Sequence, residues 1–204
     1  MEYNVILIIS SIALFIIFIV ILGIKMEKKR VSKIIQYANQ KGLKYEKEGI
    51  LEGYDFDIFK TYRIKKMKNI ISLSSDSLLY EISYTVSTGQ TTISYNYNVV
   101  EKQINNKKIP DFELSAKHGF FSKSKIEIEN NQEFNKNFIL NGNKEELLTY
   151  FDSEKTSYLL NNFNKNFKLI KHNNKFILMN PKRVNAEQYD EFLNNFNTIC
   201  NIFL

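Results

Sequence analysis

Twenty consecutive residues near the amino terminus, Val5 to Ile24, contain no charged side chain and no proline. A helix rises about 1.5 Å per residue, so this run spans about 30 Å, the hydrocarbon thickness of a bilayer. Its most polar residues are Ser10 and Ser11, and apolar residues occupy every face of the helix. A core helix of a soluble protein would carry a polar stripe, so we expect a transmembrane anchor.

The flanks of this run do not match a cleavable signal peptide. Such a peptide begins with positive residues, has an apolar core of about 7–15 residues and ends at small residues. Here Met-Glu-Tyr-Asn precedes the run and Lys-Met-Glu-Lys-Lys-Arg follows it. The one cysteine, Cys200, lies far from the position that a lipoprotein signal requires. We therefore predict a retained anchor, assigned to residues 1–25.

Positive charge gathers on one side of the anchor. Glu2 is the one charged side chain before it. Positive residues in short flanking segments stay in the cytoplasm, so the sequence predicts an amino terminus outside the cell and a cytoplasmic carboxyl-terminal domain. The membrane-flanking basic residues are Lys25, Lys28, Lys29, Arg30 and Lys33.

The rest of the chain has the composition of one folded domain. Apolar residues make up 44% of the 204-residue sequence, and 16 Phe and 12 Tyr supply enough bulk for a core. Seven Gly and two Pro argue against a linker-rich or disordered chain. A single cysteine excludes a disulfide framework and fits a reducing compartment.

The charge balance favours lipid over nucleic acid as a partner. All 28 basic residues follow the apolar run, against 21 of the 22 acidic ones, which leaves seven excess positive charges. The charge is scattered and no nucleic-acid motif accompanies it, so we expect the bilayer and its anionic headgroups as partners. The densest run, Lys60 to Lys68, holds five positive charges and is interpreted as a solvated edge strand or loop; a contact with anionic lipid is the alternative.

Helical periodicity resumes directly after the anchor. Apolar residues recur at i, i+3, i+4 and i+7 from Val31 to Ala38, and Gly42 is a good helix stop. We expect one long helix whose second half packs on the domain. The predicted organisation is an anchor over 1–25, a helical stalk over 26–41 and a cytoplasmic domain over 42–204.

The clearest strand signal covers 78–102, where apolar and polar residues alternate around a turn at Ser87 to Gln90. We interpret its tyrosines as lining the core face of a hairpin; a stacking platform for bases or carbohydrate is the alternative. Shorter strands are expected at 43–45, 54–62, 111–114, 126–129, 138–140, 167–170 and 175–179.

Three helices are expected in the carboxyl-terminal half. Two short ones cover 144–151 and 153–163, the second capped by Asp152. A long one carries apolar residues on one face from Tyr189 to Phe203, after a capping box at Asn185 and Gln188, and buries Cys200. Strands followed by helices predict an α+β domain: an antiparallel sheet packed by two short helices and a long terminal one.

No residue in the sequence qualifies as catalytic. The two histidines, His118 and His172, are far apart and have no companion at metal-ligand spacing. Asp55 and Asp57 share one face of a predicted strand and are better explained as solvated. We assign no catalytic, cofactor-binding or metal-binding residue, and expect no cofactor. A hydrolase site built from these aspartates and one histidine is the alternative.

The arrangement resembles a loose group of uncharacterised bacterial and archaeal membrane-anchored proteins with a globular domain of unknown function. The resemblance covers about half the chain. It implies an α+β domain on an anchor and transfers no functional residues. The features that carry it are the Gly53–Tyr62 strand, the Tyr80–Val99 hairpin, the Ile109–Leu114 strand, Glu133 to Phe138, Gly142 and the paired helices to Leu160.

These observations predict a single-pass membrane protein whose cytoplasmic domain is a non-enzymatic binding or scaffolding module. Tethering to the membrane raises the local concentration of the domain for membrane-protein partners. A membrane-anchored hydrolase is the alternative, and a homo-oligomer formed through the anchor or the terminal helix is a third hypothesis.

Overall fold

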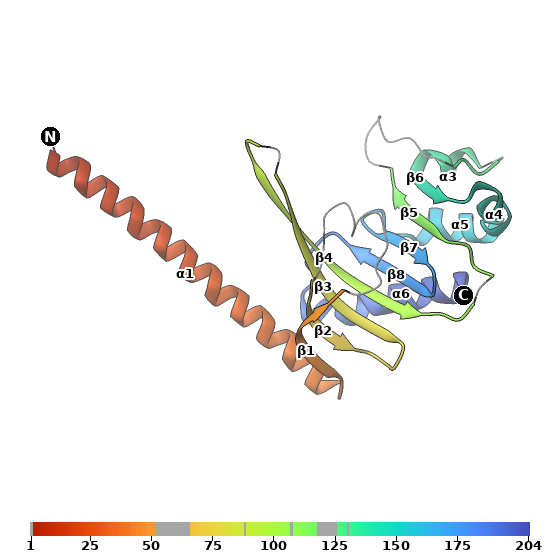
Figure 1. The fold of residues 1–204 in the computed structure, drawn as a ribbon, viewed down its shortest axis with the longest axis horizontal. Coiled ribbons are helices and arrows are strands. Elements are labelled where there is room, and N and C mark those ends of the chain that lie inside the picture. Colours follow the sequence, from red (N-terminus) through yellow and green to blue (C-terminus); the bar gives the residue numbers. More distant parts are fainter. Residues whose placement is uncertain (1, 52–65, 88, 107, 118–125, 130) are drawn as a thin grey trace.

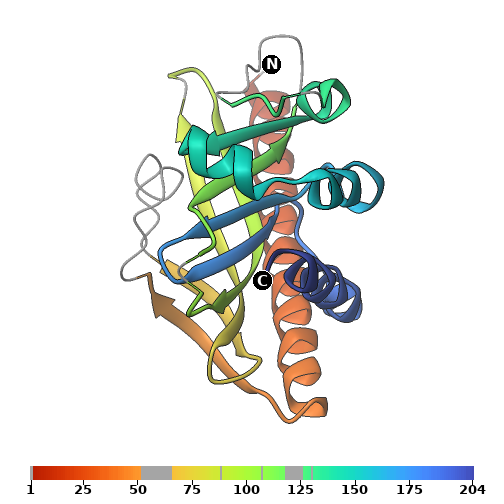
Figure 2. The same cartoon turned by 90° about the vertical axis from the view of Figure 1, so that its right-hand side faces the viewer.

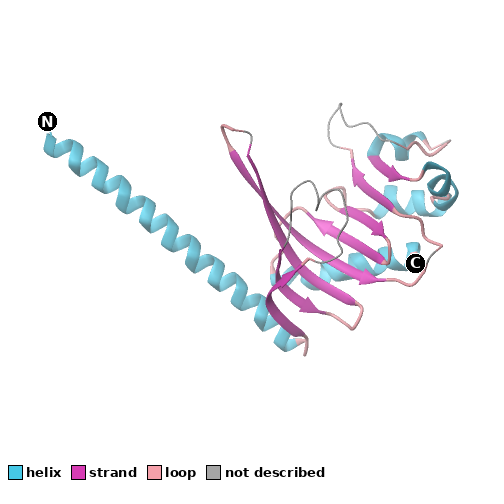
Figure 3. Cartoon of the chain, viewed as in Figure 1, coloured by secondary structure: helices cyan, strands magenta, loops and turns pink. Residues whose placement is uncertain are grey.

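The computed structural model describes residues 2–204 except 52–65, 88, 107, 118–125 and 130. One long helix leads into an eight-stranded antiparallel sheet with further helices on it, which confirms the predicted α+β class (Figures 1 and 3). The elements are α1 (Glu2–Gln40), β1 (Lys44–Ile50), β2 (Lys66–Ser72), β3 (Ser77–Ser87), β4 (Thr92–Gln103), β5 (Phe112–Ala116), α3 (Gln132–Asn137), β6 (Phe138–Gly142), α4 (Lys144–Tyr150), α5 (Ser153–Asn162), β7 (Lys168–His172), β8 (Lys175–Asn180), the 3-10 turn η1 (Ala186–Gln188) and α6 (Tyr189–Phe203).

The carboxyl-terminal hairpin joins the two halves of the sheet. The strand order is β1-β2-β3-β4-β8-β7-β5-β6, so β8 pairs with β4 and β7 pairs with β5. All of these pairings are antiparallel. The β7–β8 hairpin was predicted from its apolar runs, but its place between β4 and β5 depends on pairing between distant segments.

The helices α1, α5 and α6 lie on one side of the sheet (Figure 2). The core between helices and sheet is rich in phenylalanine, including Phe112, Phe151, Phe176 and Phe203, each at most 3% exposed. Their ring centroids lie 5.1 to 6.3 Å apart in tilted or edge-on pairs, the geometry that aromatic quadrupoles favour.

The terminal helix α6 has the predicted apolar face. Asn185 and Gln188 form the expected capping box. Tyr189 and Phe196 are buried against the sheet. Cys200 is also buried, which raises the pKa of its thiol to about 12 and makes it a core residue without nucleophilic character.

Helix α1 has two different halves. From Ile12 to Ile24 its large apolar side chains are 41 to 68% exposed, and none of the described residues in the apolar window is buried. Farther along, Ile34 and Ala38 are completely buried, as the apolar stripe predicts. The helix ends in a Schellman motif: Leu43 N–H donates to Ala38 O, and Gly42 has a φ of +66°.

One predicted strand is absent. Residues 126–129 form no strand: Ile126 makes one bridge to Leu140, and the backbone of Ile128 is hydrogen-bonded by the side-chain amide of Asn135. That amide takes the place of a neighbouring strand. It belongs to helix α3, which was not predicted and which begins where the side chain of Asn131 accepts from Phe134 N–H.

The end of the Lys60–Lys68 run also differs from the prediction. Residues 66–68 open β2, which pairs with β1 on one side and β3 on the other and is therefore not an edge strand. Lys66 and Lys68 are exposed, while Met67 between them is buried. The rest of the run lies outside the described residues, as does the predicted strand at 54–62.

The two faces of the β3–β4 hairpin are used in an unexpected way. Tyr80 is fully buried, as expected, in a smaller apolar cluster with Ile82 and Val99. Glu81, one of the polar residues that alternate with this apolar face, points to the opposite face and is only 7% exposed. The period-two pattern therefore identified the strand correctly but not which polar side chain is buried.

We predict that Gly142→Ala destabilises the fold much more than Gly42→Ala. Both glycines have positive φ, so each alanine incurs a backbone cost of about 1–2 kcal/mol. At Gly142 the added Cβ would also lie 2.5 Å from Asp111 O, whereas it meets nothing within 4 Å at Gly42. Denaturant unfolding of the full chain in detergent measures both; equal losses would contradict this account.

Candidate functional site

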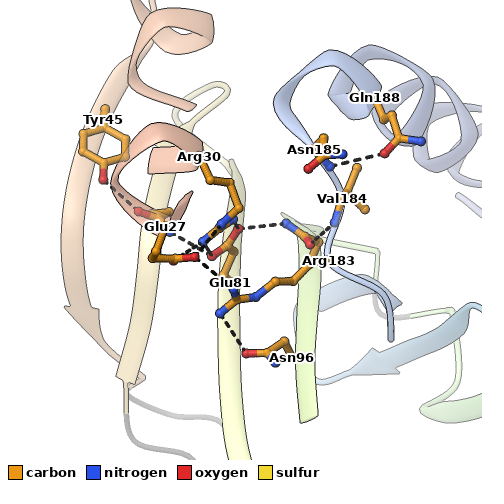
Figure 4. A network of polar contacts seen from close by, with 11 residues as sticks. Glu27, Arg30, Tyr45, Glu81, Asn96, Arg183, Val184, Asn185 and Gln188 are labelled. Atoms are coloured by element: carbon orange, nitrogen blue, oxygen red, sulfur yellow. Dashed lines mark hydrogen bonds and ion pairs between the residues drawn. The ribbon is translucent and has the colours of Figure 1, made fainter. Parts of the chain in front are cut away.

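The most connected polar cluster in the described chain lies where α1 meets the sheet (Figure 4). The guanidinium of Arg30 donates from Nη1 to Glu81 Oε1 at 2.5 Å and from Nη2 to Oε2 at 3.0 Å. Its Nε and Nη2 also donate to both oxygens of Glu27. The side chains of Arg30 and Glu81 are only 14% and 10% exposed, so most of this ion pair is removed from water. We call this cluster the junction.

Two asparagines complete the hydrogen bonding of Glu81. Asn69 Nδ2 donates to Glu81 Oε2 at 2.8 Å, and Tyr45 OH donates in turn to Asn69 Oδ1. Asn98 Nδ2 lies 3.5 Å from Glu81 Oε1. Asn69 has a φ of +49° and lies where the β2–β3 register shifts, so an irregularity in β2 directs this side chain into the junction.

The segment before η1 is fixed to the same cluster. Arg183 donates from Nη1 to Glu27 Oε2 at 3.0 Å and from Nη2 to Asn96 Oδ1 at 3.2 Å. Val184 N–H donates to the side-chain oxygen of Asn98 at 2.7 Å. The junction therefore ties α1, the four strands β1 to β4 and the entry to α6 together.

An outer layer of contacts joins α1 to the start of α6 at the surface. Lys33 pairs with Glu187 at 2.6 Å. Asp190 accepts from Tyr37 OH at 2.7 Å and from Lys41 Nζ at 3.0 Å, and these hydrogen bonds lower the pKa of its carboxyl. Because these groups are well exposed, each ion pair contributes little compared with the junction.

The junction is suited to holding elements together. Its two arginines and two glutamates balance in charge, and the carboxylates accept hydrogen bonds from arginine and asparagine side chains. Arginine forks bind carboxylates at two points and so fix orientation as well as distance. The geometry sets the direction in which α1 leaves the domain.

The structure separates the five predicted flanking residues into two groups. Lys25, Lys28 and Lys29 are exposed, the first just before the junction residues of α1 and the other two between Glu27 and Arg30. Arg30 is committed to Glu27 and Glu81, and Lys33 to its ion pair. The i, i+3 spacing of Glu27 and Arg30 is typical of an ion pair on a helix surface, and no local pattern identifies Glu81 as a second partner.

Of the residues of the hydrolase hypothesis, Asp55, Asp57 and His118 lie outside the described residues. His172 lies at the β7–β8 turn, where its Nδ1 is 3.0 Å from Asp111 Oδ2. Asp111 also accepts from Lys171 Nζ and from the N–H of Asn173. Burial opposes ionisation of Asp111, but these donors prevail and lower its pKa, so it acts as a brace for the turn.

One hollow of the described surface, about 580 Å³, is lined by six residues between the Pro110 segment and α4. A smaller one, about 210 Å³, borders the junction at Arg183 and Val184. Tyr150 on the wall of the larger hollow donates its hydroxyl to Phe203 O and shows a raised pKa, caused mainly by burial. Among the described residues, no three His, Cys, Asp or Glu side chains are grouped as metal ligands would be. The lining residues of the larger hollow are Lys108, Pro110, Glu145, Glu146, Thr149 and Tyr150.

We predict that Arg30→Met lowers the free energy of unfolding by about 3 kcal/mol, because it leaves Glu81 buried without its cation. The matched change Lys33→Met breaks an exposed pair in the next turn and should cost at most about 1 kcal/mol. Adding Glu81→Met to Arg30→Met should recover part of the loss. Denaturant unfolding of the full chain in detergent is the measurement, and equal losses for Arg30→Met and Lys33→Met would contradict the role of the junction.

Comparisons with known proteins bear on the fold. Neither protein-family models nor curated protein sequences match the chain. Among solved structures, the chain is similar to the crystal structure of the mycobacterial trehalose monomycolate transport factor A, TtfA, with a TM-score of 0.53 and 12% sequence identity. The match covers 86% of this chain and 96% of TtfA. At this identity the likeness establishes a shared fold: the chain has the α+β architecture of TtfA.

Proposed function

We propose that this protein is a single-pass membrane protein in which α1 anchors a cytoplasmic binding or scaffolding module. The observation that carries the proposal is the division of α1. Its first half exposes a continuous apolar surface and has a mean hydropathy of 2.2 over an 18-residue window, while its second half is joined to the domain. An apolar surface of this size in water would be unfavourable, and a bilayer removes the cost.

The continuity of α1 favours a retained anchor over a cleaved signal. Cleavage after the apolar run would leave the helix to begin at or just before Glu27, which pairs with both Arg30 and Arg183. The organisation that follows is an anchor over 1–25, a stalk over 26–41 that forms part of the folded domain, and the domain itself over 42–204. The exposed lysines that follow the apolar run support the orientation with the domain in the cytoplasm.

The fold supports a partner at the membrane. TtfA is named a transport factor, and its likeness to this chain favours an accessory module over an enzyme. We propose that the domain binds another membrane protein, with anionic headgroups near the exposed flank as a second partner. The pairing of His172 with Asp111 as a turn brace gives the hydrolase hypothesis no support.

The proposal predicts that the full chain stays in the membrane after alkaline carbonate extraction and that a reporter fused after Leu204 is active in the cytoplasm. Replacing the three exposed flank lysines by glutamate should shift the reporter toward the outside, because the charge bias would be reversed. Replacing exposed lysines of the domain serves as the control and should leave the orientation unchanged. The flank set is Lys25, Lys28 and Lys29; the control set is Lys144, Lys165 and Lys182.

Release of the chain by carbonate would contradict the anchor. A reporter that is active only outside the cytoplasm would contradict the orientation and leave the anchor intact.

A further inference from the structure

Strands β3 and β4 extend beyond their neighbours as a two-stranded ribbon, residues 82–87 and 92–97. In the described sheet, β2 pairs with β3 only as far as Glu81, and β8 pairs with β4 from Asn98 onward. The pairing of β3 with β4 continues to Ser87 and Thr92, and the ribbon projects from the sheet in Figures 1 and 3.

The ribbon is free of charge. The nineteen residues from Ile82 to Val100 contain no Asp, Glu, Lys or Arg, although a quarter of the chain is charged. Glu81 and Glu101 flank this stretch. Projecting elements in water are usually charged to prevent pairing with other chains. The absence of charged residues from the ribbon fits an environment in which charge is costly.

One face of the ribbon carries a stack of tyrosines. Tyr84 lies between Tyr95 and Tyr97, with ring centroids 5.1 and 5.9 Å away and near-parallel planes. Within the stack, Tyr95 is 37% exposed, and beyond the stack, toward the turn, Ile93 is 47% exposed. This apolar face is continuous with the buried cluster around Tyr80, but near the tip it is exposed.

The tip reaches the level of the membrane surface that α1 defines. Arg30 and Glu81 are in contact, which gives the helix and strand a common starting level. From there α1 rises about 7.5 Å to Lys25, whereas β3 extends about 20 Å to Ser87. Even if β3 were inclined by about 60° to the axis of α1, half of its extension would lie along that axis, and this half still exceeds the rise of α1 to Lys25. Both views show the tip on the same side as the amino-terminal half of α1 (Figures 1 and 2).

We propose that the tip of the β3–β4 ribbon inserts into the headgroup region of the bilayer that α1 spans. This inference rests on the proposed anchor. Tyrosine favours the membrane–water interface because its ring is apolar and its hydroxyl is polar, and the serines and threonines of the ribbon add no charge to desolvate. The position of the tip beside the anchor favours lipid over carbohydrate or a second protein. With two contacts, the domain has a fixed orientation on the membrane.

A fluorescence experiment on the full chain tests the insertion. A polarity-sensitive probe is attached at Ser87→Cys, in a Cys200→Ala background, and the chain is reconstituted in phosphatidylcholine–phosphatidylglycerol vesicles. We expect quenching by headgroup spin-labelled lipid and loss of quenching by iodide. Ser74→Cys, beyond the other end of β3, is the matched control and should show the opposite response. Adding Ile93→Glu to Ser87→Cys should restore iodide quenching, because it places a charge at the tip.

The outcomes separate the two proposals. If the chain floats with the vesicles but the Ser87 probe responds to iodide as the Ser74 probe does, the insertion is wrong and the anchor stands. If the probe is shielded from both iodide and spin-labelled lipid, protein from this chain or from a second copy of it covers the tip, and the lipid proposal is overturned. If the chain does not float with the vesicles, both proposals are overturned.

Discussion

The two-point contact between Arg30 and Glu81 joins α1, the helix that projects from the domain, to β3, an interior strand of the sheet. Removing both charges from water is costly, and the attraction between them offsets that cost only when the geometry and the remaining hydrogen bonds are good. Glu27 accepts a further hydrogen bond from Arg30, and Asn69 donates one to Glu81. Two apolar side chains in these positions would give a similar free energy of unfolding with less directional preference. We therefore attribute the role of the Arg30–Glu81 ion pair to the orientation that it imposes on α1.

This constraint makes α1 part of the domain. Five residues before Arg30, at Lys25, the helix enters its apolar half, and an unbroken helix offers no flexible link between the two parts. The junction joins this helix to β3 and, through Arg183 and Asn98, to the entry of α6. The proposed module is then held at the membrane in one orientation, which suits a scaffold that presents one surface to a partner.

Local patterns predicted most of the fold. The long apolar helix, the β3–β4 hairpin, the capped α5 and the apolar face of α6 all follow from periodicity and capping residues within one segment. The pairing of β8 with β4 and the burial of Glu81 depend on residues far apart in the sequence, which one sequence does not reveal. At 126–129 a side-chain amide from Asn135 replaced the neighbouring strand that the alternating pattern implied. The junction was missed for the same reason: its charges look like solvated ones until their partners are known.

Cysteine accessibility along α1, measured in inside-out membrane vesicles, distinguishes a continuous helix that lies half in lipid and half in the domain from one that lies outside the bilayer. In a Cys200→Ala background, single cysteines from Ser10 to Ile24 should resist a membrane-impermeant maleimide on every face of the helix. From Lys28 to Gln40 the exposed positions should react, while Ile34 and Ala38 stay protected. Periodic labelling within the first half, or uniform labelling of the second, would contradict the account.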